Sequence, residues 1–326
     1  MKNIFSFLMR LGLSGVLLFW ILRKIDWNKT LDAMKTADVG FLSLAAFVFV
    51  LVNFVILGRW MIFIKALELH LPAADVVKWF FIGLFCNLFL PTSIGGDVVK
   101  VIGLCKASPQ KPKVFASVVL DRLSGFAGIV LTAAIVFIFG YRLIPDKSIL
   151  ISIVALTLLS AVIVVVLFNE KFYALACRMF VSRPKVKDTL TKIHHNLSLL
   201  KNKPQPGYWA IGLSVLTQVI LALIFYLTAR ALNQNINFFY FLIFSPLVCA
   251  VTTLPSIGGL GVREVGWVYF LSKVGVAQGI AASMSLINFV FMVMIGLIGG
   301  IVYVTTLSSG RVQHHQTVAA LRSQKT

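Results

Sequence analysis

The 326-residue chain is 59% hydrophobic and only 13% charged, with a mean hydropathy of +0.93. This composition excludes a soluble globular protein, in which about 25% of the residues are charged. The 30 basic residues outnumber the 11 acidic ones and give a net charge of +19; because no nucleic-acid-binding motif accompanies them, we expect contact with an anionic membrane surface and none with nucleic acid.

Continuous apolar runs predict an all-α polytopic membrane protein with six full transmembrane helices. Each run is long enough to cross about 30 Å of hydrocarbon. In chain order the runs lie near residues 4–22, 40–64, 114–139, 148–168, 207–231 and 280–306. The first run lacks a small-residue cleavage site, so we expect an uncleaved span and no signal peptide. The four cysteines lack metal or redox spacing and are interpreted as packing residues.

Two interrupted hydrophobic stretches share a motif. The first reads Leu90-Pro91-Thr92-Ser93-Ile94-Gly95-Gly96-Asp97 and the second reads Leu254-Pro255-Ser256-Ile257-Gly258-Gly259-Leu260. Pro and Gly break helices, and the apolar arms on either side of each break are too short for a full crossing. These arms are residues 76–90, 97–105, 238–253 and 260–273. We predict two re-entrant helical hairpins, since broken helices at matching places in two halves mark transporter binding sites.

Loop charges predict the orientation of the chain. The loop over 169–206 is strongly basic and should be cytoplasmic, and it also shows the spacing of amphipathic surface helices. Counting spans from this connector places both termini in the cytoplasm and the Asn233-Gln234-Asn235 turn outside. The two hairpins then enter from opposite faces. We therefore expect one inner-membrane domain over 1–326, built as an inverted repeat with halves near 40–139 and 207–306.

The residues after each break predict a site for a phosphate-bearing head group. Helices that resume at Asp97 and near Leu260 would place their amino ends inside the membrane, where free N–H groups attract anions. Lys100 and Arg263 lie about one turn into these helices. The carboxylates of Asp97 and Glu264 either line the site or serve as helix caps and ion-pair partners, and the sequence leaves both roles open.

Charges inside the predicted spans are few, so each is a candidate for function. Asp121 and Arg122 lie within 114–139, whereas Arg59 and Arg230 either meet lipid phosphates or extend to the interface. The full set of expected substrate-binding residues is Arg59, Ser93, Gly95, Gly96, Asp97, Lys100, Asp121, Arg122, Ser256, Gly258, Gly259, Arg263, Glu264 and Asn288, with Pro91 and Pro255 as helix breakers. No metal-ligand spacing, nucleotide-binding loop or nucleophile–base arrangement occurs, so we expect no cofactor, metal or ATP hydrolysis.

These motifs resemble the transmembrane, flippase-like region of lysylphosphatidylglycerol synthases. The resemblance covers nearly the whole chain and is carried by residues 90–100, 116–123 and 254–264. It implies two oppositely inserted hairpins and movement of a phospholipid or lipid-linked substrate between leaflets. The chain departs from the family pattern at Asp121, where Glu is frequent, and at Ile287-Asn288, where the family often has an aromatic residue followed by Arg.

The resemblance also bears on whether the protein is an enzyme or a transporter. Full-length synthases carry a large aminoacyl-transferring domain, and only about twenty residues follow the last span here, so we expect a stand-alone relative that is not an enzyme and that works beside a separate lipid-modifying synthase. Two alternatives stay open. One is a membrane enzyme that uses Asp121 or Glu264 as acid or base, with Lys100 or Arg263 holding phosphate. The other is a carrier for a small solute or ion.

Overall fold

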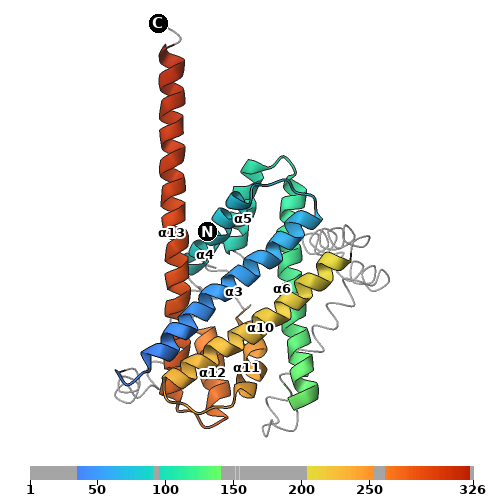
Figure 1. The fold of residues 1–326 in the computed structure, drawn as a ribbon, viewed down its shortest axis with the longest axis vertical. Helices are drawn as coiled ribbons and strands as arrows, with labels where there is room; N and C mark the ends of the chain where they lie inside the picture. Colours follow the sequence, from blue (N-terminus) through green and yellow to red (C-terminus); the bar gives the residue numbers. More distant parts are fainter. Residues whose placement is uncertain are drawn as a thin grey trace, which may run out of the picture.

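The computed structural model describes residues 35–90, 95–140, 151, 154, 204–252 and 261–323, with side chains as far as residue 306. Within these ranges the secondary structure is helical throughout, without strands (Figure 1). The helices are α3 (Val39–Ala66), α4 (Ala73–Phe89), α5 (Gly95–Ala107), α6 (Lys111–Gly140), α10 (Gln205–Ala231), α11 (Phe238–Val251), α12 (Val262–Ser272) and α13 (Gln278–Ser323).

Four of these helices are long and apolar enough to cross a membrane. They are α3, α6, α10 and the first part of α13, and they coincide within a few residues with four of the six predicted runs. The all-helical membrane class is therefore confirmed. The predicted spans at 4–22 and 148–168 lie outside the described residues, apart from positions 151 and 154, as does nearly all of the connector at 169–206.

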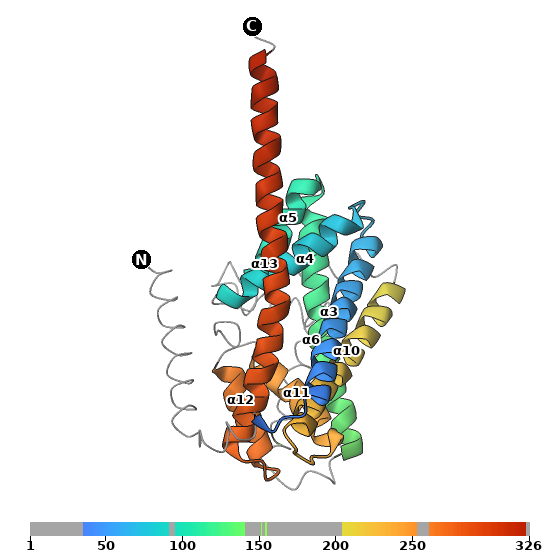
Figure 2. The same cartoon turned by 60° about the vertical axis from the view of Figure 1, so that its left-hand side comes forward.

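The remaining four helices form two pairs of short helices. Helix α4 packs against α5, and α11 packs against α12. They contain 17, 13, 14 and 11 residues, so the longest measures about 25 Å at 1.5 Å per residue. Figures 1 and 2 show the two pairs at opposite ends of the bundle. The breaks themselves, residues 91–94 and 253–260, lie outside the described residues.

The second helix of each pair begins at a different residue from the one predicted. Helix α5 starts at Gly95 instead of Asp97, because Asn87 accepts a hydrogen bond from the Gly96 N–H at 2.7 Å and extends the helical start. A Cβ on Gly96 would lie 2.2 Å from the Gly83 carbonyl, so α4 and α5 touch through backbone at this point. Helix α12 starts at Val262 after Gly261, whose φ of +84° favours glycine.

The long helices connect the two pairs across the molecule. Helices α3 and α10 pack along each other, while α13 covers α4 and α6 packs against α11. Each short pair is thus covered by a long helix from the other half of the sequence. The α13–α4 contact is close because a Cβ on Gly299 would lie 2.0 Å from the Phe81 carbonyl oxygen. Small residues allow this kind of approach between membrane helices, which lack a hydrophobic driving force for association.

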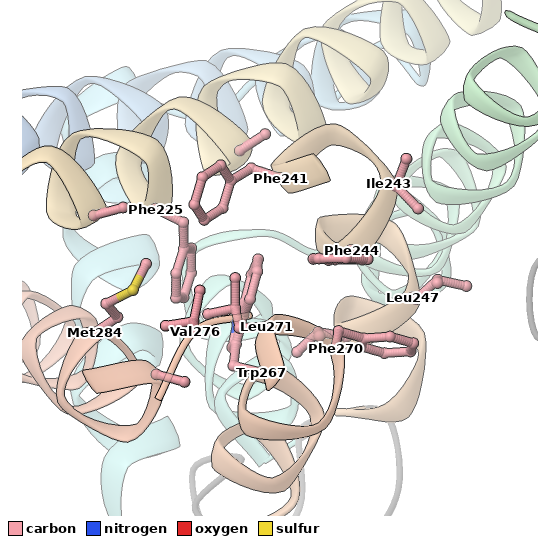
Figure 3. Close-up of a cluster of buried hydrophobic side chains, with 14 of the residues drawn as sticks. Phe225, Phe241, Ile243, Phe244, Leu247, Trp267, Phe270, Leu271, Val276 and Met284 are labelled. Atoms are coloured by element: carbon pink, nitrogen blue, oxygen red, sulfur yellow. The ribbon is translucent and has the colours of Figure 1, made fainter. Parts of the chain in front are cut away.

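Large aromatic side chains fix the second pair in place. Trp267 of α12 stacks on Phe225 of α10 with ring centroids 3.8 Å apart, and Phe270 stacks on Phe244 of α11 at 5.3 Å. Figure 3 shows this cluster enclosed by α10, α11 and α12. Burial of these rings positions the start of α12 rigidly, and the neighbouring polar groups are positioned with it.

Candidate functional site

Asp97 is the centre of a polar cluster at the start of α5. Its side chain is almost completely buried and binds two cations from different directions. The Lys100 Nζ lies 3.2 Å from Oδ1, one turn along the same helix, and Arg122 of α6 donates its Nε–H to Oδ2. Of the two roles that the sequence left open, Asp97 therefore forms ion pairs, and its pairing with Arg122 ties the first short pair to α6.

The two basic partners of Asp97 differ in their access to solvent. Lys100 is buried, with Nζ 5.2 Å from the Trp60 ring centroid and 4.8 Å from that of Phe80. Such aromatic faces stabilise an ammonium group that has lost its water. Arg122 keeps 43% of its side chain exposed. The exposed cation of this cluster is thus Arg122, whereas Lys100 lies behind it.

Arg59 and Asp121 form a second, fully internal ion pair. The Arg59 Nε–H donates to Asp121 Oδ1 at 2.7 Å, and the same guanidinium donates to the Ser214 hydroxyl at 3.0 Å. Three helices, α3, α6 and α10, meet at this pair. The guanidinium binds protein groups and its side chain is only 9% exposed. The predicted binding role of Asp121 and Arg59 stays a prediction.

The second short pair carries a smaller cluster at the start of α12. Glu264 is 1% exposed, and its Oε2 accepts a hydrogen bond from the Gly261 N–H at 2.6 Å. Its Oε1 accepts from Arg263 at 2.6 Å and from the Ser285 hydroxyl of α13 at 3.2 Å. Glu264 is therefore both a helix cap and an ion-pair partner. Arg263 is the second residue of α12 and not a full turn into it, because the helix begins two residues later than expected.

Asn288 of α13 lies one turn beyond Ser285 and is 4% exposed. Its amide nitrogen donates to the Met284 carbonyl at 2.8 Å and to the Thr228 hydroxyl at 3.3 Å, while its oxygen has no hydrogen-bond partner within the described part of the chain. Arg230 is only partly buried and donates to Asn235 at 3.0 Å. The first residue is a buried polar group of the bundle interior, and the second lies at its edge.

The structure thus divides the predicted site residues into separate groups. One group contains Asp97, Lys100 and Arg122 beside the buried Gly95 and Gly96, a second contains Arg59 and Asp121, and a third contains Arg263 and Glu264. Asn288 donates to Thr228 of α10 instead. Ser93, Ser256, Gly258, Gly259, Pro91 and Pro255 lie outside the described residues. Sequence reasoning did not single out Asn87, Ser214 or Ser285 as site residues, because each is a small polar side chain whose partner lies on another helix. Across the described ranges, no three His, Cys, Asp or Glu side chains gather to hold a metal.

Comparison with known proteins agrees with this architecture. The sequence profile of the lysylphosphatidylglycerol synthase TM region matches residues 7–300. The UPF0104 membrane protein PH1989 of Pyrococcus horikoshii is 26% identical over 334 aligned residues, which cover 92% of this chain and 96% of that protein. The UPF0104 membrane protein MJ1595 of Methanocaldococcus jannaschii is 20% identical over 298 residues, covering 85% and 87%. Because the profile covers most of the sequence, this multi-pass membrane protein belongs to the family of the lysylphosphatidylglycerol synthase transmembrane region.

Proposed function

We propose that the protein moves an anionic phospholipid or a lipid-linked phosphate substrate between the two leaflets. The observation that carries this proposal is the placement of basic side chains at the start of α5 and α12, in helix pairs at opposite ends of the bundle. Helix amino ends and basic residues together favour phosphate oxygens. In this proposal both pairs are re-entrant hairpins, related as an inverted repeat, and the head group passes between their polar ends.

The cross-packing of the helices supports the inverted-repeat proposal. Helix α13 covers α4 and α6 packs on α11, so exchanging the two halves reproduces the same contacts, with the α3–α10 pair in the centre. Rocking of one helix pair relative to the other would open the polar ends to each leaflet in turn. The Arg59–Asp121 ion pair joins α3 to α6. In this mechanism the ion pair stays intact, so α3 and α6 remain fixed to each other while the α4–α5 pair moves.

Asp97 supplies the proposed trigger. Its carboxylate forms an ion pair with the guanidinium of Arg122, which is the exposed cation of the first cluster. A phosphate head group presents the same kind of oxygen acceptor and can form paired hydrogen bonds with a guanidinium. When phosphate replaces Asp97 on Arg122, the bond between α5 and α6 is broken and Asp97 keeps Lys100 as its partner. The first helix pair is then released from α6, which couples substrate binding to movement.

Proteoliposomes provide the test. The purified full chain is reconstituted with fluorescent phosphatidylglycerol or fluorescent phosphatidylcholine, and the rate at which each probe reaches the outer leaflet is measured by chemical quenching. We expect faster movement of the anionic probe and a loss of about tenfold or more in Arg122→Gln, because a charge-assisted hydrogen bond is removed. The matched control is Lys106→Gln, which makes the same charge change at the exposed far end of α5.

Three results would contradict the proposal. One is folded wild-type protein that moves neither probe faster than empty liposomes do. Another is Arg122→Gln that moves the anionic probe as fast as the wild type. The third is a modified lipid product formed by the purified protein and lipid alone, since that result would favour a head-group enzyme over a transporter.

A further inference from the structure

Helix α13 contacts one helix of each short pair. In its first part, the Arg263 Nε–H of α12 donates to the Ser285 hydroxyl at 3.3 Å, and the Arg263 guanidinium carbon lies 5.3 Å from the Phe289 ring centroid. Further along, a Cβ on Gly296 would lie 2.4 Å from the Leu88 side chain at the end of α4. Figure 2 shows α12 and α4 beside successive parts of α13. Helix α13 therefore holds the start of α12 and the end of α4.

The spacing of these contacts shows which face of α13 makes them. Residues three, four or seven positions apart lie on the same face of a helix. The residues at this spacing are Ser285, Phe289, Met292, Gly296 and Gly299. Phe289 contacts α12, whereas Gly296 and Gly299 contact α4. Met292 therefore lies on the same face, in the interval between the two short helices.

The interval between the two contacts is short and apolar. Residues 289–296 are all apolar or glycine, and the helix rises about 10 Å over them. Arg263 lies over one end of the interval. The start of α5 lies near the other end, because Asn87, next to Leu88 in α4, accepts a hydrogen bond from the Gly96 N–H at 2.7 Å. An apolar stretch of α13 thus separates the starts of α12 and α5, which carry the two polar clusters.

We infer, on the basis of the proposed transport function, that Met292 is a gate that a lipid head group passes on its way between the two polar clusters. An apolar constriction excludes water and ions while it is closed. The Met side chain is unbranched and has three rotatable bonds, so it moves aside more easily than a branched Ile or Val. A Met at this position therefore closes the path at rest and yields to a head group.

The gate and the basic clusters have different effects on lipid selectivity. An apolar side chain does not distinguish phosphatidylglycerol from phosphatidylcholine by charge, whereas the Arg122 guanidinium favours an anionic head group. A change at Met292 should therefore alter the movement of both lipids. A change at Arg122 should alter mainly the movement of the anionic lipid.

The first test is the labelling of single cysteines in a cysteine-free variant of the full chain, in nanodiscs that expose both faces of the protein. Met292→Cys should react with a charged, membrane-impermeant thiol reagent, because the path admits water when the gate opens. The reaction should be faster in phosphatidylglycerol nanodiscs than in phosphatidylcholine nanodiscs. The matched control is Met294→Cys. Met294 is 56% exposed and lies about 200° further around α13, so surrounding lipid should protect it from the reagent.

The second test is lipid movement in proteoliposomes with the two fluorescent probes. Met292→Trp fills the interval and should slow both probes, whereas Met292→Ala widens it and should speed both. Met294→Trp and Met294→Ala are the matched controls and should keep the wild-type rates. Melting temperatures identify a variant that fails to fold, and the labelling of the smaller Met292→Cys variant decides the question in that case.

Two results would overturn the gate. One is a Met292→Cys protein that stays unlabelled in both lipids, or that is labelled no faster than Met294→Cys. The other is folded Met292→Trp that moves both probes at the wild-type rate. Failure of the proposed function gives a different result. A wild-type protein that moves neither probe, together with labelled Met292→Cys and protected Met294→Cys, would refute lipid movement and keep a water-accessible gate at Met292.

Discussion

Asp121 and Arg122 are consecutive residues of α6, but each binds a different part of the molecule. Asp121 pairs with Arg59 of α3, whereas Arg122 pairs with Asp97 of α5. Successive residues of a helix point about 100° apart, so two neighbouring charges can join two separate elements. These two consecutive positions of α6 thus tie the central helices to the first short pair.

The Arg59–Asp121 pair should be a large contributor to stability. Asp121→Asn leaves the Arg59 guanidinium buried without a charged partner, and we expect a loss of about 3–5 kcal/mol in the free energy of unfolding. Replacing both residues by Leu should recover most of this loss, because no buried charge remains. Melting curves in detergent for the single and double variants provide the measurement. A stable single variant, or a double variant no better than the single one, would contradict a structural role.

Arg263 should also affect stability, and not only transport. Arg263→Ala leaves Glu264 charged at 1% exposure, so we expect the melting temperature to fall. Arg263→Lys should restore part of the loss, because a single ammonium replaces a guanidinium that contacts Glu264 Oε1 through two nitrogens. Combining Arg263→Ala with Glu264→Gln should recover more, since the Gln oxygen can still accept from the Gly261 N–H. Identical melting temperatures in all four proteins would show that the pair is irrelevant to folding.

The α13–α4 contact should be sensitive to a single methyl group. Gly299→Ala places a Cβ 2.0 Å from the Phe81 carbonyl, and we expect destabilisation of about 1–3 kcal/mol from overpacking. Gly212→Ala is the matched control, because no atom lies within 4 Å of its added Cβ on the exposed face of α10. The control should melt at or above the wild-type temperature, since Ala favours helix. Equal behaviour of both variants would contradict the close packing.

Topology is tested by labelling single cysteines in a cysteine-free background. Both Lys106 and Asn235 are exposed, and the loop charges place the first in the cytoplasm and the second outside. In intact cells, an impermeant thiol reagent should reach Asn235→Cys, and it should reach Lys106→Cys only after the membrane is opened. Labelling of both from the same side would overturn the predicted orientation.

The sequence predicted the helices more accurately than their contacts. Apolar runs of about 20 residues have no alternative inside a bilayer except helix, so α3, α6, α10 and the first part of α13 were predictable within a few residues. The continuation of α13 to Ser323 was not predicted. Pro and Gly similarly located the ends of the short helices. The partner of Asp121 was not predictable, because adjacency in the sequence suggests Arg122 whereas the helical twist selects Arg59, 62 residues away. A single sequence contains no distances between helices.

The same limit applies to the polar residues inside the bundle. Ser214 and Thr132 look like ordinary small residues in apolar helices, and a hydroxyl there often bonds only to its own backbone. Ser214 indeed donates to the Ala210 carbonyl at 2.7 Å, and it also accepts from Arg59. Thr132 makes neither type of contact. Only the arrangement of neighbouring helices distinguishes these cases, and that arrangement depends on glycine contacts whose partners lie far away in the sequence.

The contact of α13 with α4 constrains the order in which the chain assembles in the membrane. The surface of α4 that Gly299 covers leaves the ribosome roughly 200 residues before α13 is synthesised. Until then, the face of α4 that α13 will cover contacts either the insertion machinery or lipid. Final closure of the first half thus awaits the synthesis of α13, and a chain shortened before Gly296 would lose the cover of the half that it had already inserted.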